Sequence, residues 1–229
     1  RGVAMFPNAR GLLVSATCFR ADGSGLGRAS DGLADTLVEG PPMRWLIEQG
    51  YLTDYDVVAP PSDVDYSHVP TTASGDLSPQ KLREAVHKST RIVGDVVKTY
   101  QKFAAGKLGV TFAVDVAAAN ELAAAYKVAG VMAEVISANT PDALRANILR
   151  RFKAREIMML VNVDLFGEGF DLPAIEVVVM VRKTESKGLF DQQFGRALRI
   201  MVTDAEMKAW DGYSVAERLA RIAASTKPK

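Results

Sequence analysis

Two continuous apolar runs, residues 158–161 (MMLV) and 177–181 (VVVMV), constrain the fold of this chain more than any other feature. A strand with one face in water alternates apolar and polar residues, whereas a strand covered on both faces is apolar throughout. The second run is almost entirely valine, a β-branched residue that favours strands. Both runs therefore predict strands inside a sheet that carries helices on both faces.

Strands and helices are predicted to alternate around these runs. Residues 109–115 (GVTFAVD) and 133–137 have the pattern of strands, and the alanine-rich residues 116–129 have that of a helix. A second helix is expected to follow Thr140, a capping residue, with Pro141 at its first position. This alternation indicates crossover connections and a parallel sheet. The predicted fold class is α/β, a mainly parallel sheet with helices on both faces.

The carboxyl ends of parallel strands meet at one edge of a sheet, and ligands of open α/β folds bind there. Asp115, Ser137, residues 164–171 and Thr184 each follow a predicted strand. We expect these residues to line one edge, which is the candidate site.

The region before the sheet is predicted to hold one strand and one helix. Residues 55–59 have the pattern of a strand, and residues 60–78 form a polar, proline-bearing excursion. Ser78 and Pro79 are expected to start a long helix that runs to Gly106, because Pro is favoured at the first helical position.

Residues 192–199 (QQFGRALR) are predicted to form a helix with a cationic face. At about 100° per residue, Gln192, Arg196 and Arg199 fall within roughly 60° of one another. Gly195 costs about 1 kcal/mol of helix propensity relative to alanine, which suggests that its position matters. The alternative interpretation is an amphipathic surface helix whose basic face is only solvated.

Several segments together resemble superfamily-two helicases. Residues 162–173 (NVDLFGEGFDLP) resemble motif V of that family, and residues 192–199 resemble motif VI, Gln-x-x-Gly-Arg-x-x-Arg. Residues 12–17 (LLVSAT) resemble motif III, and residues 112–115 stand where motif IV is expected. The order of the segments is that of the family, whose phage and restriction-type branch usually has proline in place of Cys18. The resemblance implies a RecA-like lobe of the P-loop-NTPase type.

The same resemblance divides the chain into two parts. Residues 1–48 are expected to be the end of a first RecA-like lobe with a linker, and residues 49–229 a second lobe truncated at its C-terminal end. The phosphate loop is missing, since Gly106 and Lys107 are followed by Leu108, and so is the Asp-Glu box. Those motifs hold the nucleotide phosphates and Mg²⁺. ATP with Mg²⁺ is therefore expected only in the intact enzyme, with Mg²⁺ held by the missing first lobe, and this chain alone is predicted to be inactive.

The resemblance also implies roles for single residues near the nucleotide. Arg196 and Arg199 are the candidate arginine fingers, and Gln192 is expected to orient them or to contact the nucleotide. Gly169 and Asp171 match motif V positions that couple the nucleotide to the nucleic-acid groove. These five residues are the predicted catalytic and cofactor-binding set.

Other residues are implied in nucleic-acid binding and in coupling between lobes. Arg145 stands where related lobes place an arginine on a backbone phosphate, and Asp164 and Thr184 are expected at the same groove. Ser15 and Thr17 are expected to link the two lobes. The predicted partners are nucleic acid, with DNA favoured over RNA, and the missing first lobe.

Composition adds little to this interpretation. The net charge of +1 gives no global support for nucleic-acid binding, so the case rests on local patches. One cysteine and two histidines provide no metal-ligand spacing, and no metal site is predicted. No apolar run approaches the roughly 18 residues of a membrane span. A cytoplasmic location is expected, in the host cytoplasm if the protein is phage-encoded.

Two other classes stay open at the level of sequence. A Rossmann-type small-molecule enzyme would use the same kind of sheet, but it would need an early glycine fingerprint, and residues 23–27 (GSGLG) lack the required spacing. A non-catalytic nucleic-acid-binding or regulatory module derived from the lobe is the other class. Intact Gln192, Arg196 and Arg199 argue against it.

Overall fold

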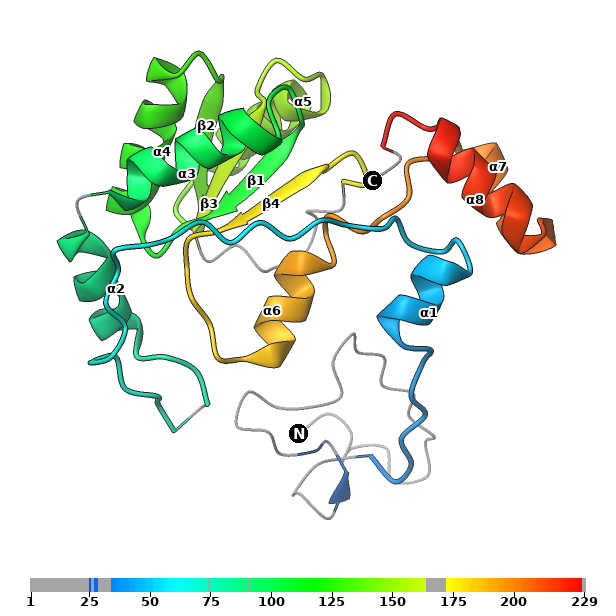
Figure 1. Cartoon of the computed structure of the whole chain (residues 1–229), viewed down its shortest axis with the longest axis horizontal. Coiled ribbons are helices and arrows are strands. Elements are labelled where there is room, and N and C mark those ends of the chain that lie inside the picture. The colour runs from blue at the N-terminus through cyan, green and yellow to red at the C-terminus, as the bar shows by residue number, and fades with distance from the viewer. Residues whose placement is uncertain are drawn as a thin grey trace.

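A parallel four-stranded sheet forms the centre of the chain (Figure 1). The computed structural model describes residues 25, 27–28, 34–73, 75–89, 91–163 and 172–227. The strands are β1 (Gly109–Phe112), β2 (Ala133–Ser137), β3 (Met159–Val163) and β4 (Val177–Met180). Their order in the sheet is β2-β3-β1-β4, and every pair is parallel. The predicted sheet is confirmed.

Helices cover both faces of this sheet. On one face α3 (Ile92–Phe103) and α4 (Val116–Val128) pack in a buried cluster that includes Val97, Tyr100, Leu122, Tyr126, Met159 and Val161. On the other face α5 (Asp142–Lys153) packs in a second cluster that includes Val110, Phe112, Ile148, Phe152 and Leu160. The alternation along β1 and β3 therefore divides their side chains between two cores, as expected for strands without a solvent face.

Capping residues set the start of several helices. The Asp115 carboxylate accepts a hydrogen bond from the Ala118 N–H at 2.8 Å and so caps α4. Thr203 with Glu206, and Ser214 with Glu217, form capping boxes at the starts of α7 (Asp204–Ala209) and α8 (Val215–Ala224). Before α5, however, the cap position is Pro141 rather than Thr140, because the Thr140 hydroxyl instead accepts from the Ser137 N–H at 2.9 Å.

The prediction of a single long helix between residues 79 and 106 is wrong. The chain forms α2 (Pro79–Lys88), breaks, and continues as α3. Ser89 is extended at the break, and its hydroxyl accepts from the Ile92 N–H at 3.0 Å. A serine that bonds the backbone in this way favours a new helix start over continuation.

The strand expected at residues 55–59 is also not formed, although this segment is extended. It pairs with no strand of the described sheet, and Val57 and Val58 are 73% and 44% exposed. Figure 1 shows it running from α1 (Met43–Glu48) past β4 toward α2. Across a cavity this segment faces side chains of α3, β4 and α6 (Lys187–Phe194), and it does not pair with β4, although β4 is an edge strand of the described sheet.

The C-terminal helices contact the turn after α1. The sequence alone did not predict these helices. The buried Arg218 guanidinium donates from Nε to the Gln49 carbonyl at 2.7 Å and lies 4.5 Å from the centre of the Tyr51 ring. The Trp210 indole, in the short 3₁₀-helix η3 (Trp210–Gly212), donates to the Gly50 carbonyl at 2.9 Å. These contacts join residues 49–51 to a unit about 160 positions later.

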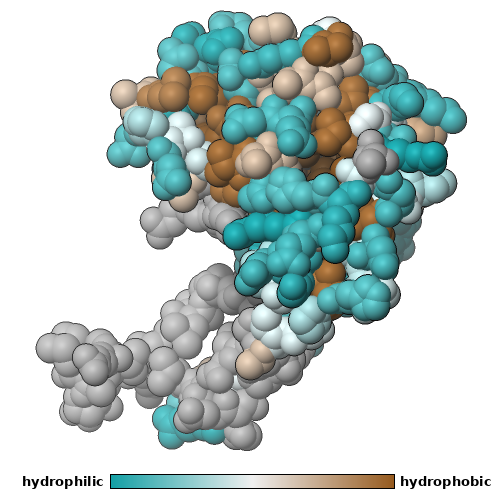
Figure 2. Space-filling view, turned by 90° about the vertical axis from the view of Figure 1, so that its left-hand side faces the viewer, coloured by the Kyte–Doolittle hydropathy of each residue, from teal (hydrophilic) through white to brown (hydrophobic). Residues whose placement is uncertain are grey.

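The surface is mixed in character. Seen from the side of α2, hydrophilic side chains cover much of the described surface, and apolar ones come through in separate patches (Figure 2). Among the described residues, no helix has the length and apolar character needed to cross a membrane.

Gly50→Ala is expected to destabilise the protein by about 2 kcal/mol or more. Gly50 has a φ of +73°, and an added Cβ would lie 2.8 Å from the Arg218 Cβ. Urea unfolding followed by circular dichroism measures the change. Gly106→Ala is the matched control, because it has a φ of +76° with open space around it. Equal losses in both variants would show that the close approach to Arg218 contributes nothing.

Candidate functional site

The carboxyl edge of the sheet gathers polar side chains, as predicted. Because β1, β2 and β4 run parallel, the residues that follow them lie at the same edge, among them Asp115, Ser137 and Thr184. The Asp115 carboxylate also lies 2.8 Å from His87 Nε2. Five predicted site residues lie outside the described residues: Ser15, Thr17, Asp164, Gly169 and Asp171.

The helix predicted to carry both arginines ends before them. α6 stops at Phe194 with Gly195 as its C-cap, and Arg196 to Arg199 follow in tight turns. The bonds there run over three residues, such as Ala197 N–H to the Phe194 carbonyl at 3.1 Å, where a helix would bond over four. The calculated helical face is therefore wrong for Arg196 and Arg199. We name residues 195–199 the arginine turn.

Groups from distant parts of the chain bind three successive carbonyls of the arginine turn. The Thr53 hydroxyl donates to the Ala197 carbonyl at 3.4 Å, and the Thr53 N–H donates to the Leu198 carbonyl at 2.8 Å. The ammonium of Lys227 donates to the Arg199 carbonyl at 2.7 Å. Leu52 also forms an antiparallel bridge with Arg199. The carbonyls of residues 197–199 therefore accept hydrogen bonds from distant groups, and these tertiary bonds fix the backbone of the arginine turn.

The polar side chains of α6 and the arginine turn have contrasting surroundings. Gln192 is exposed, whereas Gln193 is completely buried, and neither amide atom of Gln193 has a hydrogen-bond partner among the described residues. Arg196 and Arg199 are both partly buried. Burial lowers the pKa of the Arg196 guanidinium, which nevertheless stays charged at neutral pH. A cation with few waters around it is suited to bind an anion.

Thr184 has a clear structural partner. Its hydroxyl donates to the Asp76 carboxylate at 2.9 Å, and that carboxylate also accepts from the Glu185 N–H at 2.8 Å. Burial opposes ionisation of Asp76, but these donors together hold its pKa below the usual value. The pair therefore fixes the connection between β4 and α6, and it joins that connection to the polar excursion.

Arg145 organises the loop between β2 and α5. Its guanidinium Nη2 donates to the carbonyls of Ser137, Ala138 and Thr140 at 3.4, 3.4 and 3.2 Å. Its Nε is buried without a hydrogen-bond partner in the described part of the chain. About 31% of the side chain is exposed, so the guanidinium keeps a solvent-facing side at the carboxyl edge of the sheet.

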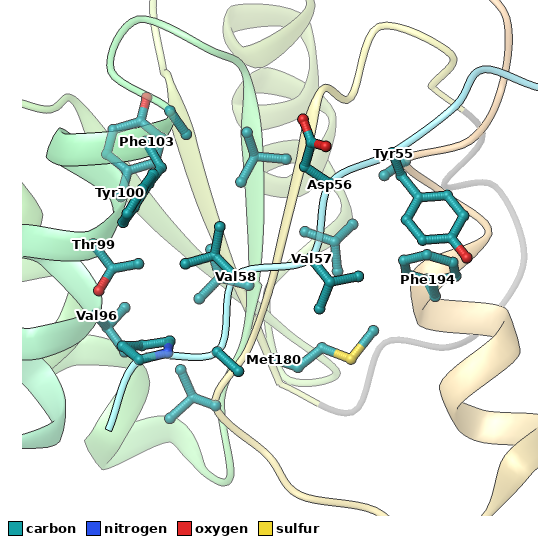
Figure 3. A pocket seen from close by; sticks show the side chains of 18 of the residues that line it. Tyr55, Asp56, Val57, Val58, Val96, Thr99, Tyr100, Phe103, Met180 and Phe194 are labelled. Carbon is teal, nitrogen blue, oxygen red and sulfur yellow. The ribbon is translucent and has the colours of Figure 1, made fainter. Parts of the chain in front are cut away.

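A cavity of about 600 Å³ lies beside α6 on its aromatic side (Figure 3). Val57 and Val58 cross it between α3 and α6, and Tyr55 packs edge-on against Phe194 with ring centres 4.7 Å apart. None of Gln192, Arg196 and Arg199 lines this cavity. Of the arginine turn, Ala197 lines the cavity and the two arginines do not.

The sequence interpretation missed several residues that shape the site. Gln193 adjoins a residue of the recognised motif, but no pattern marked it as buried. The capping boxes at Thr203 and Ser214 were readable signals for the C-terminal helices. Thr53 and Lys227 carried no sequence signal, because their role depends on contacts across the whole chain.

Comparison with known proteins gives a consistent result. Residues 111–201 match the helicase conserved C-terminal domain. A 51.5 kDa protein of a Lactococcus phage (isolate 7-9) is 36% identical over 174 residues, which are 75% of this chain and 38% of that protein. IRC3 of Saccharomyces cerevisiae, which is named as an ATP-dependent helicase, is 30% identical over 190 residues, 81% of this chain and 27% of that protein. This chain therefore spans well under half the length of either relative.

Solved structures overlap more weakly. The helicase domain of Pyrococcus furiosus Hef is 20% identical and covers 59% of this chain and 28% of its own, with a TM-score of 0.35. An overlap of this size carries no argument about the site.

Gly195→Ala is expected to destabilise the protein by about 1 to 3 kcal/mol, because an added Cβ would lie 2.9 Å from the Asp191 carbonyl oxygen. Thermal unfolding measures the loss. Gly94→Ala, in α3 with open space around it, is the control and should stabilise by up to about 1 kcal/mol. A stabilised Gly195→Ala variant would show that the turn tolerates a side chain and that the glycine has another role.

Proposed function

Since this chain carries the conserved C-terminal domain of a superfamily-two helicase, we propose that it forms the second RecA-like lobe of an ATP-dependent nucleic-acid helicase or translocase. In this proposal residues 1–48 are the end of the first lobe with the linker, and residues 49–229 belong to the second lobe. ATP binds between the lobes, so that closure of the two lobes makes the affinity for nucleic acid depend on the nucleotide state. The observation that carries the proposal is the arginine turn, a short segment with two arginines whose backbone is held from both sides.

The arginine turn supplies charge to a phosphate. A guanidinium is always ionised and presents a planar fork of donors that matches phosphate oxygens. Arg199 and Arg196 would bind and orient the terminal phosphates, and the exposed Gln192 of α6 remains a candidate contact to the nucleotide. Arginine fingers contribute on the order of 10³ to 10⁵ in rate in other phosphoryl-transfer enzymes. The held backbone supports this role, because a finger acts only if its position is fixed before the reaction.

Mg²⁺ is proposed to bind in the first lobe, because the phosphate loop and the Asp-Glu box that hold it in P-loop enzymes are not found in this sequence. The described residues include no group of three carboxylate, imidazole or thiol side chains that could hold a metal ion. Gly169 and Asp171 remain candidates for coupling the nucleotide to the groove, and Ser15 and Thr17 for coupling the lobes.

The nucleic-acid track is proposed to cross the carboxyl edge of the sheet, with DNA favoured over RNA. Arg145 supports this because it keeps an exposed side there, next to the end of β2. Thr184 supports it less well, since its hydroxyl is already bonded to Asp76. Asp164 stays a candidate by its place in the motif.

A non-catalytic module derived from the same lobe is the second candidate. It would bind nucleic acid without nucleotide turnover. The buried amide of Gln193, which has no hydrogen-bond partner in the described part of the chain, and the partly buried guanidinium of Arg196 are costly to keep, and this cost favours the catalytic lobe.

Arg199→Ala in the full-length protein is expected to reduce ATP turnover by about 10³-fold or more, because a finger binds phosphate charge mainly in the transition state. Nucleic-acid affinity without nucleotide should stay nearly unchanged. Arg199→Lys should restore little, since an ammonium lacks the planar fork. Steady-state ATPase and fluorescence-anisotropy assays measure the two effects.

The control for that experiment is Lys187→Ala. Lys187 is the first residue of α6, and its side chain is 81% exposed. Its turnover should match that of the unchanged protein. Normal hydrolysis by Arg199→Ala, or loss of its fold, would return the arginine turn to a packing role.

Arg145→Ala is expected to weaken nucleic-acid binding about equally on all sequences and to lower the magnitude of the salt slope by about one unit. Binding measured across a salt series gives the slope. Arg150→Ala, on the same helix with a 65% exposed side chain, is the control. An unchanged slope in Arg145→Ala would leave Arg145 with a structural role toward its three carbonyl partners and Asp142.

A further inference from the structure

Lys227 is a buried cation that the proposed mechanism does not yet use. Its side chain is 1% exposed, and its ammonium donates to the carbonyls of Pro173 and Arg199 at 2.8 and 2.7 Å. Burying an ammonium is unfavourable unless its charge is compensated. Two backbone carbonyls compensate the buried charge in part, and the Lys227 side chain therefore fixes the distance between the two segments that carry them.

The two carbonyls belong to the two segments nearest the proposed nucleotide site. Arg199 is the candidate finger itself. Pro173 comes two residues after Asp171, at the return of the chain from the motif V segment toward β4. Lys227 therefore joins the end of motif V to the end of motif VI by a single group.

The base of this link is rigid. The Lys227 N–H donates to the Ser225 hydroxyl at 3.1 Å, and that hydroxyl donates to the Ile222 carbonyl at the end of α8 at 2.7 Å. The position of α8 is itself fixed by Arg218, whose Nη1 donates to the Tyr213 carbonyl at 3.0 Å. Lys227 thus follows directly after a helix whose position is fixed by contacts that do not involve Lys227.

Two charged groups act on Lys227 from the elements around it. Burial lowers the pKa of Lys227 to about 8; the carboxylate of Glu176, at the start of β4, opposes this shift, and the guanidinium of Arg199 adds to it. Glu176 is itself paired with Arg155 at 2.8 Å. Loss of the proton near pH 8 removes the charge from both hydrogen bonds, and charge-assisted bonds are roughly twice as strong as neutral ones.

We propose that Lys227 is a positioning residue for the proposed phosphoryl-transfer reaction, in which its ammonium holds the Arg199 carbonyl against the Pro173 carbonyl and so sets where the Arg199 guanidinium stands. This inference rests on the proposed function of Arg199. It gives a role to the donor from the segment after α8, because Thr53 binds only the two preceding carbonyls of the arginine turn.

Lys227→Met tests the link in the full-length protein, because methionine keeps an unbranched apolar stem and lacks the ammonium with its charge and donors. We expect kcat for ATP to fall about tenfold, the scale on which a displaced catalytic group loses rate, while KM changes less than twofold. Lys208→Met, on an exposed lysine of α7, is the matched control and should change neither constant.

The dependence on pH separates positioning from simple stability. In the unchanged protein kcat should decline as pH rises through about 8, the value to which burial lowers the pKa of Lys227. Lys227→Arg keeps its charge throughout this range, so it should retain most activity and lose the decline. If Lys227→Met does not fold, the comparison of these two pH profiles decides. A decline that persists in Lys227→Arg overturns the proposal.

A double variant shows whether Lys227 acts through Arg199. In an Arg199→Lys background, Lys227→Met should cause no further loss of kcat in single-turnover assays, whereas independent effects would multiply. A full tenfold loss in that background overturns the positioning role. Normal turnover by Arg199→Lys and Arg199→Ala means that the proposed function has failed, whereas loss of turnover in both, with Lys227→Met fully active, means that only this inference has failed.

Discussion

Burial of both faces of the parallel sheet is the constraint on which the rest of this structure depends. Parallel strands need crossover connections, and those connections are the helices that cover the sheet. Each strand therefore points the same way, and each loop that follows a strand reaches the same edge. Asp115, Ser137 and Thr184 lie along that one edge because the strands that precede or contain them are parallel.

The arginine turn shows a second way in which backbone polarity shapes the site. A buried carbonyl needs a donor, and a helix normally supplies that donor four residues later. In the arginine turn, which begins after α6 ends at Phe194, Thr53 and Lys227 supply such donors from far away in sequence. The two arginines consequently stand on a tight turn whose backbone is fixed by tertiary contacts. Fixed backbone is what a phosphate-binding guanidinium requires.

The C-terminal helices give this lobe a feature that lies outside the matched domain, which ends at residue 201. Trp210 and Arg218 hold the turn after α1, and Lys227 holds the arginine turn. One small unit thus contacts both the chain that enters the lobe and the segment that carries the candidate finger. Residues 49–51 are therefore linked to the arginine turn by contacts of the C-terminal helices and by Leu52 and Thr53.

The sequence by itself determined the class of fold, the strands of the sheet and the motif that contains Gln192, Arg196 and Arg199. These features depend on local periodicity and on residues close together in the chain, and both can be read without a structure. It misjudged the helix break at Ser89, the state of residues 55–59 and the end of α6 at Phe194. At Ser89 a side chain competes for the backbone, whereas residues 55–59 depend on whether a partner edge is within reach. Tertiary structure alone decided that Arg199 stands on a turn held by Thr53 and Lys227, because a carbonyl 28 residues from its donor leaves no trace in local pattern.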